Sequence, residues 1–361
     1  MATIDLGRVG FVNKGTYSGV FAYKLNDVVV YNSGTYACIQ ANTGQLPTVT
    51  AYWQVWVAND KAPLDSPALV NPTINGVAQS GYTGFKNLLI NGGFDVWQRG
   101  TSGASGYVAD RWFYSTNGAT QSKNNFNVNG SYNSCLTITE TNGTGAPLLV
   151  QGIEGFNKMG GKILTVSFWI YRETNTVGRT FNVSLFKNSN SLFGSTIQTI
   201  EFQNDVPLTT WTKVTKTFNA LPYDTTNNIL TLSIGTVGGI STYHITGVQL
   251  EEGSVATPFE QRPLGLELSL CQRYYEKSGL GGILGGYISA GGATYFIQPF
   301  KVTKRDVPTI VKNDGGTSNV TSTAVSAARI DGFTHLVIGT ASGVFFIGGS
   351  IDYTWTASAE L

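Results

Sequence analysis

Hydrophobic and polar residues alternate along the middle of the chain. Residues 163–172 (ILTVSFWIYR) place Leu, Val, Phe and Ile on one face and the following residues on the other: Thr165, Ser167, Trp169 and Tyr171. A period of two over this length predicts a strand that is buried on one side. The pattern recurs at residues 181–185 and 230–234, and polar turns lie between the strands. We therefore predict an all-β domain over residues 87–262, a β-sandwich of the jelly-roll type.

The first part of the chain, residues 1–60, predicts a small separate β module. Residues 27–31 and 35–39 are rich in β-branched and aromatic side chains, and they flank Asn32-Ser33-Gly34. This arrangement is typical of a strand, a turn and a second strand. A module of this length has a small core, so much of its aromatic content must be structural.

Three further segments complete the predicted organisation. Residues 61–86 are proline-rich at their start, which disfavours a helix or a central strand and predicts an extended linker. In residues 263–277, Leu266, Leu270 and Tyr274 recur at helical spacing and predict a short helix with an apolar stripe. The stripe packs either on the chain's own sandwich or against other copies of the chain. Residues 278–361 predict a C-terminal β domain, with strands at 344–347 and 351–355.

Composition narrows the class of protein. Charged residues make up 12% of the chain, about half the usual share, while glycine (44 residues) is enriched. These values are typical of a β-rich extracellular or virion-type protein. A net charge of +1 argues against nucleic-acid binding by bulk charge, and we expect neither a membrane-inserted segment nor a secretory signal.

Residues that carry chemistry are few. The chain has two histidines and three cysteines, and none of them has metal-ligand spacing: His244, His335, Cys38, Cys135 and Cys271. Nothing in the sequence forces two carboxylates to face each other across a substrate. We therefore predict no catalytic residue, no metal site and no cofactor, although a structural calcium ion held by loop oxygens remains open. The prediction is that the protein is not an enzyme.

The N-terminal module also carries a family resemblance. It is similar to the chitin-binding-type carbohydrate modules found in bacterial chitinases and phage tail proteins, through these residues: Tyr23, Asp27, Val28, Tyr31, Gly34, Tyr36, Gly44, Pro47 and Trp53. The sequence departs from this pattern at Asn26, where the family has glycine, and at Tyr17, where it favours tryptophan. Asparagine tolerates a positive φ, so we expect the turn at Asn26 to be retained.

The ends of the central domain carry a second resemblance. Residues 87–100, 109–112, 245–253, 257–263 and 266–276 look like the signature ends of a carbohydrate-binding-like jelly-roll module in bacteriophage tail fibres and related virion proteins. Residues 63–73 look like one copy of a tail-fibre shaft repeat, which makes a trimeric neck the alternative to a linker. The resemblance implies a homotrimer in a phage tail that contacts other tail or baseplate proteins. It also implies a virion component that is assembled in the host bacterial cytoplasm.

Sugar binding is the chemistry that suits this composition. The C–H faces of sugars lie on aromatic rings, and their hydroxyls bond to polar side chains. The candidate carbohydrate-binding residues are Tyr31, Tyr36, Trp53, Trp56, Trp169 and Tyr171, and the alternative is that these rings fill cores or subunit contacts. We predict a tail fibre or spike that recognises host cell-surface polysaccharide. The alternatives are a purely architectural collar or baseplate component without a ligand, and a polysaccharide depolymerase.

Overall fold

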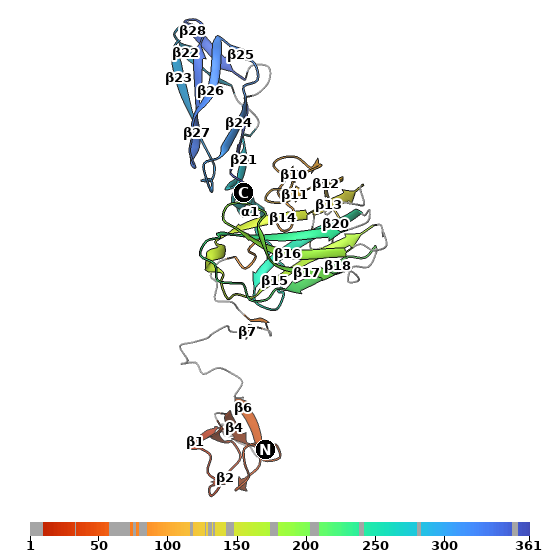
Figure 1. Cartoon of the computed structure of the whole chain (residues 1–361). Coiled ribbons are helices and arrows are strands. Elements are labelled where there is room, and N and C mark those ends of the chain that lie inside the picture. The colour runs from red at the N-terminus through yellow and green to blue at the C-terminus, as the bar shows by residue number, and fades with distance from the viewer. Residues whose placement is uncertain are drawn as a thin grey trace, which may run out of the picture. The chain divides into compact units, whose positions relative to one another are not determined.

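The computed structural model of the chain describes residues 10–32, 34–57, 73–74, 77–78, 85–115, 118–126, 128, 132, 134–141, 148–173, 180–202, 209–237, 242–279, 283–348 and 353–361 (Figure 1). These residues are almost entirely strands and connecting turns, so the all-β prediction is confirmed. The chain divides into two units, Met1–Gly81 and Tyr82–Leu361. Most of the predicted linker or neck, including its prolines, lies outside the described residues, apart from a short hairpin of β7 (Thr73–Ile74) and β8 (Val77–Ala78).

The N-terminal unit contains a four-stranded sheet in the order β1-β3-β4-β6 and a separate two-stranded pair. The strands of the sheet are β1 (Val12–Thr16), β3 (Asp27–Tyr31), β4 (Gly34–Cys38) and β6 (Trp53–Val57), and the pair is β2 (Ala22–Tyr23) with β5 (Asn42–Thr43). The predicted hairpin is β3 and β4. Asn26 has a φ of 70°, so asparagine supports the left-handed turn at the position where the similar carbohydrate modules have glycine.

The central domain is a sandwich of two six-stranded antiparallel sheets. One sheet has the order β10 (Gly106–Tyr107), β11 (Phe113–Ser115), β14 (Leu148–Glu154), β19 (Ile229–Val237), β16 (Thr180–Asn188) and β17 (Ser195–Phe202). The other has the order β18 (Thr212–Thr217), β15 (Leu164–Arg172), β20 (Thr242–Glu252), β13 (Cys135–Glu140), β12 (Ala119–Asn124) and β9 (Ser102–Gly103). The inward residues of both sheets form one hydrophobic core, in which Phe168 and Ile170 of the predicted strand are fully buried. The sandwich prediction is confirmed.

The helix differs from its prediction in length and in its buried face. Among the described residues, α1 (Leu264–Gln272) is the one α-helix, and a short 3-10 turn lies earlier in the chain at Phe156–Lys158. After α1 the chain extends into β21 (Tyr275–Lys277). Leu266 is exposed, whereas Glu267 and Cys271 are buried. The prediction that Leu266 belongs to the buried stripe of the helix is therefore wrong. Glu267 is buried in its place because its carboxylate accepts a hydrogen bond from the Asn91 N–H and forms an ion pair with Arg262. No helix among the described residues is long and apolar enough to cross a bilayer.

The C-terminal domain consists of three three-stranded antiparallel sheets. Their strands are β21, β29 (Thr354–Ser358) and β24 (Thr309–Asn313); β22 (Leu284–Ile288), β28 (Gly343–Ile347) and β25 (Thr317–Ser318); and β23 (Ala293–Pro299), β27 (Gly332–Gly339) and β26 (Val320–Ala328). Of the strand predicted at 351–355, residues 351–352 lie outside the described residues, and the described strand β29 begins at Thr354. β29 is the central strand of its sheet, and the Ala359 N–H donates to the Tyr274 carbonyl, so the C terminus lies beside α1 (Figure 1).

Candidate functional site

The outer face of the sheet that contains β15 carries the two candidate residues of the sandwich. Phe168 and Ile170 point into the core, and alternation therefore turns Trp169 and Tyr171 to the opposite face, where both are half-buried. Strand register then decides their neighbours. Tyr171 lies opposite His244 of β20, and Ile170 pairs with Thr212, so that Trp211 lies beside Tyr171 just before β18 begins.

Four aromatic residues gather there around one imidazole, and we call Phe126, Trp169, Tyr171, Trp211 and His244 the aromatic patch. The rings of Phe126 and Tyr171 are stacked with centroids 6.0 Å apart, and the rings of Tyr171 and Trp211 are 5.6 Å apart. The Phe126 ring meets the His244 ring edge-on at 4.7 Å. These separations lie within the range of favourable aromatic pairs. The patch therefore brings together residues that are more than 100 positions apart in sequence, such as Phe126 and His244.

His244 fixes the centre of the patch through both ring nitrogens. Its Nε2 lies 2.9 Å from a carboxylate oxygen of Glu173, and its Nδ1 lies 2.7 Å from the hydroxyl oxygen of Thr137. A carboxylate only accepts, so the neutral ring must donate from Nε2 and accept the Thr137 proton at Nδ1. Burial lowers the pKa of His244, against the opposing effect of Glu173. The imidazole is therefore a rigid neutral support for the surrounding rings.

This row of hydroxyl, imidazole and carboxylate has the wrong exposure for nucleophilic catalysis. In a hydrolytic triad the hydroxyl faces the substrate and the carboxylate is buried behind the histidine. Here Thr137 is 6% exposed, whereas the Glu173 side chain is 43% exposed. The end of the row that meets solvent is therefore the carboxylate and not the hydroxyl. We interpret the row as a positioning network.

The rim of the aromatic patch is polar. The Trp169 side chain hydrogen-bonds to the side chain of Tyr132. Lys213 pairs with Trp169 across β15 and β18 and is exposed. Together with Glu173, it places an ammonium and a carboxylate beside half-buried rings. A surface of this composition offers stacking area and hydrogen bonds within a small area.

The candidates of the N-terminal unit have different environments. Trp53 is buried, its indole N–H donates to the Gln45 carbonyl, and its ring packs against Tyr17 and Tyr23. Tyr31 and Tyr36 are half-buried, and their rings meet edge-on with centroids 6.5 Å apart. The side chain of Trp56, the remaining candidate, lies outside the described residues. Trp53 thus fills the core of the unit, whereas Tyr31 and Tyr36 reach its surface.

Comparison with known proteins finds likeness in fold only. No protein-family model matches the sequence, and no curated protein matches it. Solved structures that resemble part of the chain include the enzymatically active domain of tailspike protein 4 of bacteriophage CBA120 (14% identity, TM-score 0.34, 46% of this chain). Others are a family 61 carbohydrate-binding module in complex with β-1,4-galactotriose (15%, 0.30, 47%) and a cyclase from Fischerella sp. TAU (11%, 0.35, 46%).

These matches differ in how much of the other protein they span. The matched stretch covers 22% of the tailspike chain, but 100% of the carbohydrate-binding module and 96% of the cyclase. The likeness describes the architecture and carries no information about which ligand this chain binds.

Three carboxylates of the central domain, Asp110, Glu251 and Glu252, are held in separate contacts. Asp110 is buried, where burial raises its pKa to about 6, and it pairs with Arg99 at 3.3 Å. Glu251 accepts hydrogen bonds from Thr257, and Glu252 pairs with Lys162 at 2.8 Å. Among the described residues, no group of three or more His, Cys, Asp or Glu is arranged to hold a metal ion.

Both histidines should titrate below the ordinary value of 6.5, because burial lowers the pKa of each. As the pH falls, the unfolded chain then takes up these two protons before the folded chain does. The stabilisation that neutral His244 and His335 provide is therefore fully present above pH 6.5 and is lost as the pH falls below it. Imidazole NMR signals followed from pH 8 to pH 5 check the shift, and the variant His335→Gln assigns the two signals. A midpoint at or above 6.5 for His244 would contradict the expected burial effect.

Sequence reasoning found Trp169 and Tyr171 but missed Phe126, Trp211 and His244. Phe126 and Trp211 each stand next to polar residues outside a predicted strand, so no alternation marks them. The one local signal was an aromatic residue directly before a strand-like segment at Trp211. Their meeting depends on strand register, which a single sequence does not specify.

Proposed function

We propose that this chain is a structural protein of a phage tail, a fibre or spike, and that the aromatic patch of its sandwich binds glycan on the host cell surface. The observation that carries the proposal is the patch itself. Half-buried rings lie on the outer face of a sheet whose other face is filled by the core. Rings held in place by strands lose little conformational freedom when a ligand binds.

The composition of the aromatic patch suits direct, non-covalent contact with a sugar. A pyranose ring can lie on Tyr171 or Trp211, while its hydroxyls donate to Glu173 and accept from Lys213. The proposed activity is binding without cleavage, because the chemical groups near the patch form a positioning network and not an acid–base pair. The architectural alternative, a component without any ligand, predicts that the same rings have no role in binding.

Assembly into a homotrimer is part of the proposal, and the C-terminal domain supports it. Tyr287 and Val344 are cross-strand neighbours on β22 and β28, and both are exposed. Tyr295 and Ile297 are exposed on β23. Apolar side chains gathered on sheet surfaces in this way mark association sites more often than free surface. Three linked copies of a weak site also bind a repetitive glycan about 10²–10⁴ times more tightly than one copy.

The test combines host polysaccharide with two patch variants. Wild-type protein should bind surface polysaccharide of a susceptible host, and Tyr171→Ala and Trp211→Ala should each weaken binding about tenfold or more, as loss of a central aromatic contact does. Calorimetric titration measures the affinity, and an assay for new reducing ends on the same samples detects cleavage. Light scattering of the wild-type protein gives its mass, for which the monomer value is 38.7 kDa.

Tyr223→Ala is the matched control, because this tyrosine of the same sandwich is exposed and does not belong to the patch. It should bind like the wild type. Unchanged affinity in both patch variants would refute the binding site and leave the architectural alternative. New reducing ends would establish the depolymerase instead, and a monomer in solution would refute the trimer.

A further inference from the structure

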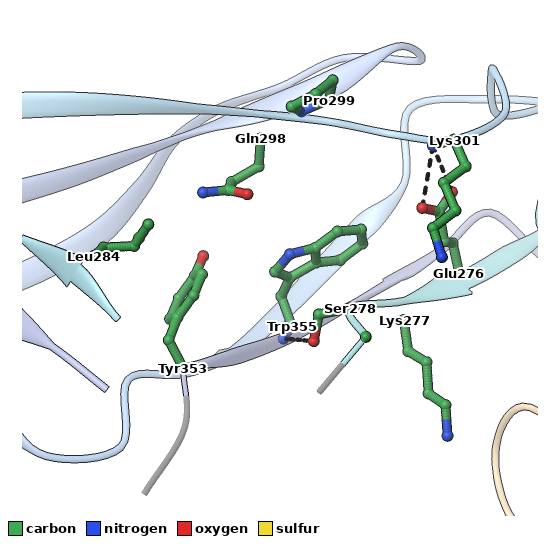
Figure 2. A pocket seen from close by; sticks show the side chains of 10 residues that line it. Glu276, Lys277, Ser278, Leu284, Gln298, Pro299, Lys301, Tyr353 and Trp355 are labelled. Carbon is green, nitrogen blue, oxygen red and sulfur yellow. Dashed lines mark hydrogen bonds between the residues drawn. The ribbon is translucent and has the colours of Figure 1, made fainter. Parts of the chain in front are cut away.

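The C-terminal domain contains a cavity of about 280 Å³ that is separate from the aromatic patch. Figure 2 shows it between the segment of Tyr353 and Trp355 on one side and Gln298 of β23 on the other, with Leu284 of β22 at its end. Ligand sites in proteins usually have volumes of about 300–1,000 Å³. This cavity is therefore at the lower end of that range and has room for one sugar unit.

Tyr353 brings an unsatisfied polar group to this cavity. Its side chain is 4% exposed, and its hydroxyl has no hydrogen-bond partner among the residues that the structure describes. Figure 2 shows this hydroxyl and the Gln298 amide directed toward the same space. Buried hydroxyls are normally paired, because an unpaired one loses its bond to water without replacement. Burial, with a smaller effect of Asp314, raises the pKa of Tyr353, so the phenol keeps its proton and can donate it.

Other donors converge on the same cavity. The indole nitrogen of Trp355 lies on the side of the ring that faces Tyr353 (Figure 2). The backbone N–H and carbonyl of this residue both bond to Ser278, whereas its indole N–H has no hydrogen-bond partner among the described residues. Indole and phenol both donate, and the Gln298 amide can donate as well. A ligand rich in acceptor oxygens would satisfy all three.

The charge at the cavity is positive. Lys301 lines it with an exposed side chain and forms no ion pair within the described part of the chain, whereas Figure 2 shows the Lys277 side chain directed away from the cavity. Glu276, the carboxylate among the lining residues, is already neutralised: Lys304 Nζ lies 2.6 Å from it, and the Lys301 backbone N–H donates to it. The unbalanced group is therefore the Lys301 ammonium, which favours an anionic ligand.

We propose that this cavity binds a carboxylate-bearing sugar unit of an acidic glycan, with the carboxylate at Lys301 and the ring hydroxyls at Tyr353 and Gln298. The inference rests on the proposed function only in taking the ligand to be a glycan. It concerns a second site, formed by residues that the aromatic patch does not use. The two sites therefore fail or succeed independently.

D-glucuronate is the probe, and D-glucose is the matched neutral sugar. Saturation-transfer NMR and calorimetric titration of the full chain should show glucuronate binding at millimolar concentration and glucose binding at least about tenfold more weakly. Tyr353→Phe removes only the unpaired hydroxyl and should weaken glucuronate binding several-fold. Lys301→Ala, at an exposed position, should abolish the preference for glucuronate over glucose.

Tyr295→Phe, at an exposed tyrosine of the same domain, is the control and should leave binding unchanged. Tyr171→Ala should also bind glucuronate normally, even where it has lost the polysaccharide bound by the patch. The inference is overturned if 50 mM glucuronate gives no signal with the wild type, if glucose binds equally well, or if Tyr353→Phe and Lys301→Ala both bind like the wild type. None of these results would alter the outcome of the patch experiment.

Discussion

Replacing Arg111 with alanine is expected to lower the free energy of unfolding of the unit Tyr82–Leu361 by about 3–5 kcal/mol. The Arg111 side chain is 1% exposed and forms an ion pair with Glu360, near the end of the chain. It also contacts Gly152 and Tyr274. It donates to the Gly152 carbonyl at 2.7 Å, and its guanidinium carbon lies 3.4 Å from the Tyr274 ring centre. Without this guanidinium, the buried Glu360 carboxylate keeps only Arg99 as an ion-pair partner. Urea denaturation followed by circular dichroism measures the change.

Backbone strain does not contribute to this difference. Arg111 has a φ of 71°, and alanine at this position meets the same steric cost because both residues have a Cβ atom. The control is Arg273→Ala, because the Arg273 side chain is 40% exposed and pairs with Glu154 at 3.0 Å. An exposed pair of this kind contributes at most about 1 kcal/mol. If Arg111→Ala cost no more than this control, Arg111 would not anchor the C terminus to the sandwich.

The second large effect is expected at the buried ion pair of the C-terminal domain. Lys304 and Glu276 are both fully buried and are joined at 2.6 Å. Lys304→Met leaves the Glu276 carboxylate buried without its counter-charge, which should cost about 3–5 kcal/mol. Glu276→Gln should cost less, because burial already lowers the pKa of Lys304 and the lysine can lose its proton once Glu276 no longer opposes this.

The double variant Lys304→Met/Glu276→Gln separates pairing from the burial of charge. It removes both charges, and the new amide can still accept the Lys301 N–H. We expect it to be more stable than Lys304→Met alone, and urea denaturation of the four proteins gives the coupling between the two sites. A double variant that loses the sum of both single losses would mean that the two charges do not stabilise each other.

Local pattern was sufficient for the strands and misleading at the helix. The alternation in Leu164–Arg172 identified both the strand and its buried face, because side chains of a strand point to opposite sides whatever the strand pairs with. The helix ends at Gln272 although its periodicity continues to Tyr274. Tyr275 instead pairs with Ser358, so a strand from the end of the chain decides where the helix stops.

Burial of single residues was equally beyond local pattern. Lys304 reads as a surface lysine in the sequence, and its complete burial depends on Glu276, 28 positions earlier. Trp53 reads as a ring that a sugar could contact, yet Tyr17 and Tyr23 enclose it in the core of the N-terminal unit. Aromatic side chains serve a core and a binding surface equally well, so residue type alone does not separate the two uses.

The sequence by itself determined that this chain is all-β, that its middle is a sandwich, and that Trp169 and Tyr171 share a face away from the core. Periodicity carries this information because it depends only on neighbours along the chain. Tertiary structure alone decided that Phe126, Trp211 and His244 join Tyr171, and that Tyr353, Trp355 and Gln298 meet at one cavity. Both groups come from segments that lie close together only through strand register and packing, and these are set by the whole core rather than by any local stretch.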